Sequence, residues 1–143
     1  MGMQRFTIVL GIWGAVGPLV GVIVGHVLTR SWQQRQWLLD QRKEEWRELL
    51  STLTASFATI CKLTGPVMVL DGNDMQKLDE AQTLAQTTIR DRIFIAKEVK
   101  ELKIYELWVS AARQFEKEKI YIPFAEQYAL INAKIVGAAT KGL

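Results

Sequence analysis

Side chains that can do nucleophilic or acid–base chemistry are scarce in this chain of 143 residues. There is one histidine, His26, and one cysteine, Cys61. His26 lies in a long apolar stretch near the amino terminus, so no histidine remains elsewhere to activate Cys61. Cys61 sits in a dense apolar segment, where we expect a small buried core residue. The sequence therefore predicts no catalytic residue, and we expect that the protein is not an enzyme.

Metal and cofactor motifs are also missing from the sequence. Zinc sites use paired cysteines or histidines at fixed spacings, and a chain with one of each cannot form them. The segment from Gly65 to Gly72 lacks the pattern of a phosphate-binding P-loop. We therefore predict no metal site and no cofactor.

The longest apolar stretch covers residues 6–28, where the only polar side chains are those of Thr7 and His26. As a helix it is about 35 Å long, which exceeds the roughly 30 Å of hydrocarbon in a bilayer. A cleaved signal peptide has an apolar region of about 7 to 15 residues that ends at small residues, and HVLTRSW offers no such site. The sequence therefore predicts a retained signal anchor over residues 1–30, with one transmembrane helix.

Basic residues flank the predicted anchor unevenly, because Arg5 precedes it whereas Arg30 and Arg35 follow it closely. Positive charge stays on the cytoplasmic side, so we expect the amino terminus outside and the carboxyl-terminal domain in the cytoplasm. Trp32 and Trp37 suit the membrane interface, and Arg30 and Arg35 suit contact with anionic lipid. The arrangement resembles small membrane-anchored helical proteins of bacteria, which implies location in the inner (cytoplasmic) membrane.

The net charge of +3 does not indicate nucleic acid as a partner. Of the 18 basic side chains, Arg5 and Arg30 account for two, which leaves 16 beyond residue 30 against 15 acidic ones. The two signs are interspersed, as on an ordinary solvated surface, rather than gathered into a stripe that follows phosphates. Membrane lipid is the better partner for the surplus charge.

Small residues recur inside the predicted anchor at Gly17, Gly21, Gly25 and Thr29. This spacing places them on one helix face, where missing side chains let another helix approach closely. Glycine is also generally commoner in membrane helices, which is the plainer explanation. Pro18 frees backbone groups that need another helix or water, and this favours association. We therefore predict a homo-oligomer, with packing against a different membrane protein as the alternative.

His26 is the one titratable side chain within the apolar stretch. A group of this kind at membrane depth suggests pH sensing or the lining of a pore. His26 lies within three residues of the end of the stretch, so a plain interfacial position is favoured.

Large apolar side chains recur every seven residues beyond the anchor, at Trp32, Leu39, Trp46, Leu53 and Ile60. The companion positions are polar up to Lys43 and apolar from Leu50 onward. A thin apolar stripe suits an exposed stalk, and a wide stripe suits a globular core. The sequence therefore predicts a charged helical stalk over residues 31–47 and a bundle helix over residues 48–64.

The junction between anchor and stalk has two interpretations. No glycine or proline occurs between Gly25 and Gly65, so one helix can run through it. Ser31 and Gln34 fit a capping box, which would start a new helix at the membrane surface. The continuous helix is favoured because nothing in this segment forces a turn.

The remaining chain predicts further helices with short connections. Residues 65–74, GPVMVLDGND, end the first bundle helix, and Asp74 can cap the next. Further helices are expected up to residue 95, over residues 97–119 and from Phe124 onward, although one helix through residue 95 is an alternative. These elements predict an all-α fold with an antiparallel cytoplasmic bundle over residues 48–143.

Two features are candidate docking sites for a partner. One is the apolar loop of Val67, Met68, Val69 and Leu70, and the other is the pair Arg90 and Arg92. Each has a plainer explanation, because the loop can cover the core and the arginines can form salt bridges within the bundle.

Together these observations predict a single-pass membrane scaffold or adaptor. It would oligomerise through its anchor and present a helical head to a cytoplasmic partner. A pore-forming effector with His26 at its inner mouth is one alternative, and an accessory subunit of a larger membrane complex is another.

Overall fold

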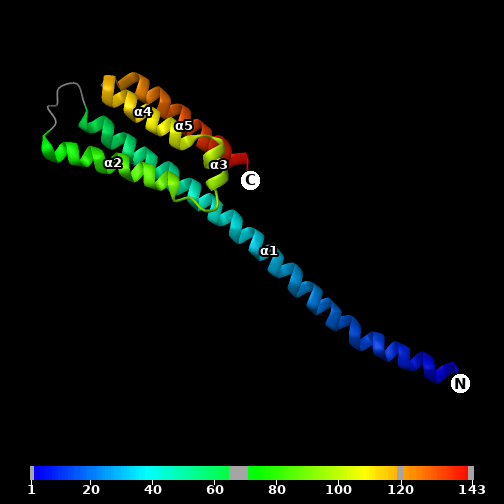
Figure 1. The fold of residues 1–143 in the computed structure, drawn as a ribbon. Helices are drawn as coiled ribbons and strands as arrows, with labels where there is room; N and C mark the ends of the chain where they lie inside the picture. The colour runs from blue at the N-terminus through cyan, green and yellow to red at the C-terminus, as the bar shows by residue number, and fades with distance from the viewer. Residues whose placement is uncertain (1, 65–70, 119–120, 142–143) are drawn as a thin grey trace. The chain divides into compact units, whose positions relative to one another are not determined.

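The computed structural model describes residues 2–64, 71–118 and 121–141, with side chains from residue 20 onward except that of residue 121. Every regular element in this described part is a helix: α1 (Gly2–Leu63), α2 (Gly72–Arg90), α3 (Ala96–Glu101), α4 (Ile104–Glu118) and α5 (Tyr121–Lys141) (Figure 1). The chain divides into two compact units, Met1–Leu39 and Asp40–Leu143. The all-α prediction is confirmed.

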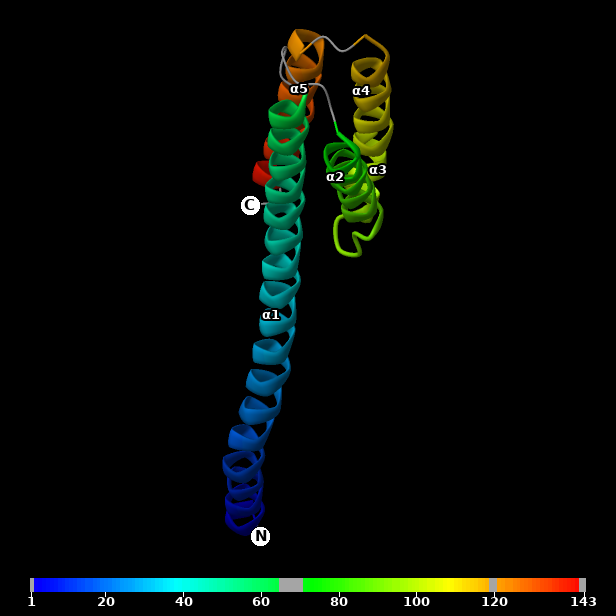
Figure 2. The ribbon, with the colours of Figure 1, turned by 90° about the vertical axis from the view of Figure 1, so that its left-hand side faces the viewer.

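Within the unit Asp40–Leu143, the end of α1 lies beside α2 and α5 in a bundle completed by α4, and neighbouring long helices run antiparallel (Figures 1 and 2). α4 packs against both α2 and α5, and the short α3 packs against α4. α1 meets α5 through Phe57 and Tyr128, whose stacked ring centroids are 4.1 Å apart. The predicted helical bundle is therefore present.

The buried core takes an apolar stripe from each long helix of the bundle. In α5 the buried residues are Phe124, Tyr128, Ile131 and Ile135, the spacing that the sequence predicts for a docked helix. They meet buried side chains of α1, α2 and α4, among them Leu49, Leu53, Ile60, Ile89, Ile104, Trp108 and Phe115. Burial of these stripes is the main source of the bundle's stability.

Trp108 is the largest fully buried side chain of this core in the described residues. Its indole meets the ring of Phe124 edge-on, with centroids 6.2 Å apart. The Nε1–H of Trp108 has no hydrogen-bond acceptor among the described residues. The apolar contact area of this tryptophan therefore outweighs the cost of burying its one polar group.

The compact unit begins at Asp40, within the segment predicted as a stalk, residues 31–47. Trp46 is only 5% exposed and belongs to the core, and Glu45 and Arg42 contact the chain beyond α2. Trp46 continues the series of apolar residues that recurs every seven positions. Lys43 is polar and lies at a companion position, so the apolar stripe is narrow there. Burial of Trp46 and these polar contacts extend the bundle toward the amino terminus beyond the predicted start at residue 48.

The helix expected over residues 97–119 is interrupted in the structure. α3 ends at Glu101, and α4 starts at Ile104 after a turn at Leu102 and Lys103. Lys103 has a φ of 56°, a left-handed conformation that residues other than glycine adopt rarely. No glycine or proline signals this turn, so a pattern of apolar spacing runs through it unbroken.

Helix starts also differ from the predicted positions. The cap of α2 is Asp71, whose carboxylate accepts the N–H of Asp74 at 2.8 Å. α5 includes Ile122 although Pro123 follows, because a proline in the first helical turn has no intrahelical N–H to lose. The predicted break over residues 65–70 lies outside the described residues.

Truncation of Phe57 tests the aromatic contacts that join α1 to α5. Phe57 lies between Tyr128 and Phe124, with ring centroids 4.1 and 5.2 Å away, so Phe57→Ala leaves a gap between the helices. We expect a loss of about 3 kcal/mol in the free energy of unfolding, measured by urea denaturation. Leu84→Ala, on an exposed face of α2, is the control and should change it by less than about 0.5 kcal/mol. Equal losses of unfolding free energy in the two variants would show that Phe57 does not contribute to the core.

Candidate functional site

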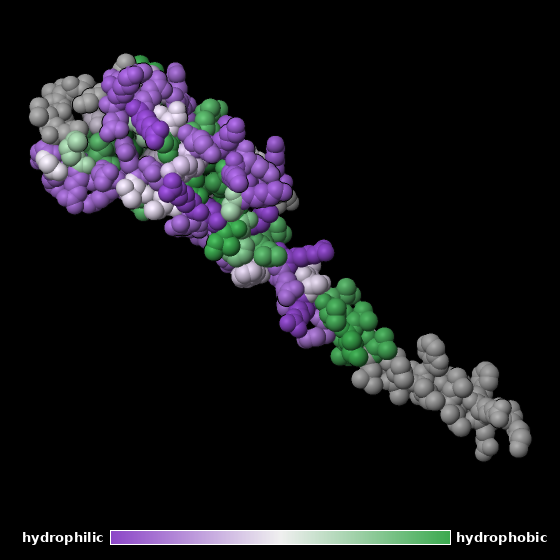
Figure 3. Space-filling model, in the orientation of Figure 1, coloured by the Kyte–Doolittle hydropathy of each residue, from purple (hydrophilic) through white to green (hydrophobic). Residues whose placement is uncertain are grey.

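The most apolar exposed surface in the described part lies on α1 within the unit Met1–Leu39. Six side chains between residues 20 and 28 are each at least half exposed: Val20, Val22, Ile23, Val24, Val27 and Leu28. Figure 3 shows them as an apolar zone next to the grey amino-terminal residues. Trp32 and Trp37 follow at 62% and 54% exposure. No other described part of this unit buries the six apolar side chains of residues 20–28.

Hydroxyl groups in this segment are satisfied by the helix itself. Thr29 donates its Oγ1–H to the carbonyl of Gly25 at 2.8 Å, and Ser31 donates to the carbonyl of Leu28 at 2.9 Å. Ser31 is therefore not a helix cap, and α1 runs on without the hinge that was the alternative interpretation. Because these hydroxyls already donate within the helix, their transfer to an apolar environment without water costs less free energy.

The predicted glycine strip is open where the structure describes it. A methyl group built on Gly21 or Gly25 would meet no atom within 4 Å outside its own helix turn. Thr29 lies exposed one turn further along. Gly17 lies outside the residues whose side-chain surroundings are described. The described strip is thus a notch in the helix surface that no described residue fills.

The other predicted interfacial residues of α1 are exposed. His26, Arg30 and Arg35 all lie on the open helix surface. A shallow hollow of about 520 Å³ beside them is lined by Leu28, Thr29, Ser31, Trp32 and Arg35. Apolar and cationic groups therefore meet on one side of α1.

Among the residues that the structure describes, no helix has an apolar stretch long enough to cross a membrane. The side chains of residues 2–19 lie outside the described part, and these residues include most of the predicted anchor.

A second group of polar residues holds the end of the bundle where α1 enters it. The Glu45 carboxylate accepts three consecutive backbone N–H groups, those of Ile93, Phe94 and Ile95, at 3.0, 2.8 and 3.1 Å. Successive N–H groups that converge in this way form a concave anion site, and here the occupant is part of the same chain. Glu45 therefore fixes the turn between α2 and α3 onto α1.

Two arginines complete this polar end. Arg42 pairs with Glu98, in α3, at 2.5 Å. Arg92, a predicted docking residue, is 7% exposed, binds Glu48 at 2.6 Å and donates to the carbonyl of Thr88. The plainer interpretation of Arg92 as an internal salt bridge matches its geometry.

Arg90, the other predicted docking cation, has a different environment. Its guanidinium lies over the ring of Tyr105, 4.5 Å from the centroid, and donates to the Tyr105 hydroxyl. The structure thus separates Arg90 from Arg92, one on an exposed surface and one inside the bundle. Val67, Met68, Val69 and Leu70 lie outside the described residues.

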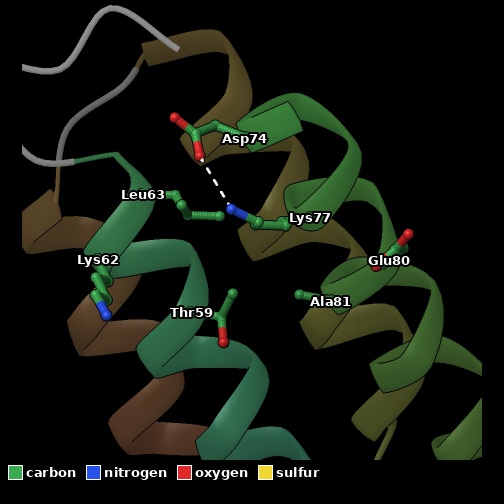
Figure 4. Close-up of a pocket in the computed structure, with 7 residues that line it drawn as sticks. All are labelled: Thr59, Lys62, Leu63, Asp74, Lys77, Glu80 and Ala81. Atoms are coloured by element: carbon green, nitrogen blue, oxygen red, sulfur yellow. Dashed lines mark ion pairs between the residues drawn. The ribbon is translucent and has the colours of Figure 1, made fainter. Parts of the chain in front are cut away.

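A groove of about 620 Å³ separates α1 from α2 at the other end of the bundle (Figure 4). Thr59 and Leu63 of α1 face Ala81 and Lys77 of α2 across it. The Lys77 ammonium lies 3.6 Å from the Asp74 carboxylate. Two lysines and two acids line the groove, so it has no net charge to select an ionic ligand.

Cys61 is a free, half-buried thiol, and burial raises its pKa. Within the described ranges, no cluster of His, Cys, Asp or Glu side chains has the geometry to hold a metal ion.

Comparisons with protein-family models, curated proteins and solved structures found no match.

Glu45→Ala tests the turn-holding contact. The substitution removes a charged acceptor from three N–H groups, each of which is part of a partly buried turn, so we expect a loss of about 2 kcal/mol or more in the free energy of unfolding. Glu44→Ala is the matched control, because Glu44 is exposed and, among the described residues, pairs with Arg47 on the same helix. Losses of the same size in urea denaturation would contradict the role of Glu45.

The Glu48–Arg92 pair predicts a pH dependence of stability. The hydrogen bond from Arg92, and then its positive charge, hold the pKa of Glu48 below its ordinary 4.5. A lowered folded-state pKa stabilises the fold above pH 4.5, and this contribution is lost as the pH falls through the lowered pKa.

In a series of urea denaturations between about pH 6 and 3, the wild type should therefore lose more stability than Glu48→Gln. The difference should be below about 1 kcal/mol, because the Glu48 side chain is 59% exposed. Glu44→Gln should follow the wild type. Parallel curves for Glu48→Gln and the wild type would rule out this contribution.

Proposed function

We propose that the chain is a single-pass membrane-anchored scaffold, which oligomerises through its glycine-notched anchor and presents the helical bundle to a cytoplasmic partner. The observation that carries the proposal is the apolar stretch of residues 6–28. Within this stretch, the large apolar side chains between residues 20 and 28 are each at least half exposed. Complete transfer of each such Val, Leu or Ile from water to lipid is favourable by about 1.5–3 kcal/mol. Water is therefore the least favourable surrounding for this segment.

The polar groups of the segment support the same location. Thr29 and Ser31 satisfy their hydroxyls within α1, and Arg30, Trp32 and Arg35 follow where a membrane interface would lie. The surplus of basic residues after the stretch favours a cytoplasmic bundle in a bacterial inner membrane.

Self-association is supported by the glycine strip. In lipid, helices associate by close packing rather than by the hydrophobic effect, and the notch at Gly21 and Gly25 leaves space for a neighbouring backbone. One helix carries this notch and also supplies the core residues Leu49, Leu53 and Ile60 of the bundle. Pairing of anchors would therefore gather several bundles at one place, which is the physical basis of a scaffold.

Gly21→Leu tests the proposed assembly. A Cβ built at position 21 meets no described atom within 4 Å outside its own helix turn, so we expect a leucine there to interfere only with a neighbouring helix. We expect the full chain, extracted in mild detergent, to form a discrete oligomer whose dissociation constant rises at least about tenfold in Gly21→Leu. Analytical ultracentrifugation measures the mass, and Val22→Leu, one position away from the strip, is the control.

The location is checked in the same preparation by washing membranes at alkaline pH before extraction. Retention in the membrane pellet supports an integral anchor, and release into the supernatant would disprove it. A monomeric chain that copurifies with other membrane subunits would replace the scaffold by an accessory subunit.

A further inference from the structure

A small pocket of about 170 Å³ lies where α2, α3 and α4 meet. Its floor includes Ile89 and Val99, which are buried core residues. Its rim carries the side chains of Arg90, Lys100, Tyr105 and Glu106. An apolar floor with a rim of two cations, one hydroxyl and one carboxylate has the mix of groups that small-molecule sites use, and its cations favour an anion.

The two cations of the pocket have no carboxylate partner among the described residues. Arg90 contacts the ring and hydroxyl of Tyr105, and Lys100 makes no ion pair in this part of the chain. Nearby cations differ, because Arg92 pairs with Glu48 and Lys97 lies 3.8 Å from Glu101. The positive charge of Arg90 and Lys100 is thus not neutralised by the fold, apart from the single carboxylate of Glu106.

The break between α3 and α4 brings the pocket residues together. On one continuous helix, residues 100 and 105 would point about 140° apart and could not line one small pocket. The turn at Leu102 and the left-handed Lys103 redirects the chain, so Lys100 and Tyr105 share this pocket. A left-handed lysine costs roughly 1 kcal/mol more than glycine would.

We propose that this pocket binds a phosphate monoester dianion. Arg90 can donate two parallel hydrogen bonds to phosphate oxygens, and Lys100 supplies a compact positive charge. The apolar floor accepts the first carbons of the ester. A dianion gains twice the Coulomb energy of a carboxylate from this positive rim, and Glu106 reduces that gain because it lowers the net charge of the rim to +1. This binding does not depend on the proposed anchor or on oligomerisation.

Isothermal titration calorimetry of the full chain in neutral detergent tests the site, with inorganic phosphate and methyl phosphate as probes. We expect saturable binding with a Kd of about 1 mM or tighter. Arg90→Gln and Lys100→Gln should each weaken binding about tenfold, and Glu106→Gln should strengthen it severalfold. Lys117→Gln, a lysine of α4 outside the pocket, is the control. Lys100 is exposed, so Lys100→Gln keeps the test valid if Arg90→Gln unfolds.

Absence of saturable heat in the wild type, or equal weakening in Lys117→Gln, would overturn the proposal. The source of the phosphate is separated by adding phosphatidic acid or phosphatidylcholine to the micelles. Competition by phosphatidic acid alone supports a lipid headgroup as the ligand, and retained phosphate binding without competition supports a soluble ester. Equal competition by both lipids, with no effect of the Lys100 variant, would contradict a phosphate-specific pocket.

Discussion

Burial of one apolar stripe along α1 is the interaction on which the rest of the structure depends. Trp46, Leu53 and Ile60 lie on this stripe and are buried in the bundle, whereas Trp32 and Leu39 continue it and are 62% and 44% exposed. The partner helices have 19, 15 and 21 residues, or roughly 22–32 Å of helix, against 62 residues in α1. They cannot cover α1 along its whole length. The proposed membrane anchor concerns the part of α1 that lies in the other unit, Met1–Leu39.

Polar contacts of α1 mark the amino-terminal end of the bundle. Arg42, Glu45 and Glu48 recur every three residues on α1, so they share one helix face. Each reaches the chain beyond α2: Arg42 binds Glu98, Glu45 binds the turn after α2, and Glu48 binds Arg92. The turn between α2 and α3 has backbone N–H groups that lie outside any helix and need acceptors. The Glu45 carboxylate supplies these acceptors, and it thereby joins the amino-terminal residues of the bundle in α1 to the turn between α2 and α3.

The sequence predicts the parts of this fold that depend on local periodicity. The bundle and the buried positions of α5 follow from apolar spacing along single helices, and the continuous α1 follows from the lack of glycine and proline between Gly25 and Gly65. It does not predict contacts between residues far apart in the chain, such as Arg42 with Glu98, because a charged residue has several partners at helical spacing. The turn at Lys103 is missed for a related reason, since no glycine or proline marks it. The anchor remains a prediction from composition, as does the role of the glycine strip.

Arg90 and Arg92 show why the candidate pocket also escapes sequence reasoning. The two arginines are separated by one residue and look equivalent in the segment TIRDRIF. α2 ends at Arg90, so the chain turns between them and sends Arg92 back toward Glu48 while Arg90 stays beside Tyr105. Arg92 neutralises a carboxylate of the fold, and its charge is not accessible to a ligand. Arg90 keeps its charge at a surface shared with Lys100, and a cation that the fold does not neutralise attracts an anion from solution. The same end of the bundle thus holds cations with different roles, and the helix end at Arg90 separates them.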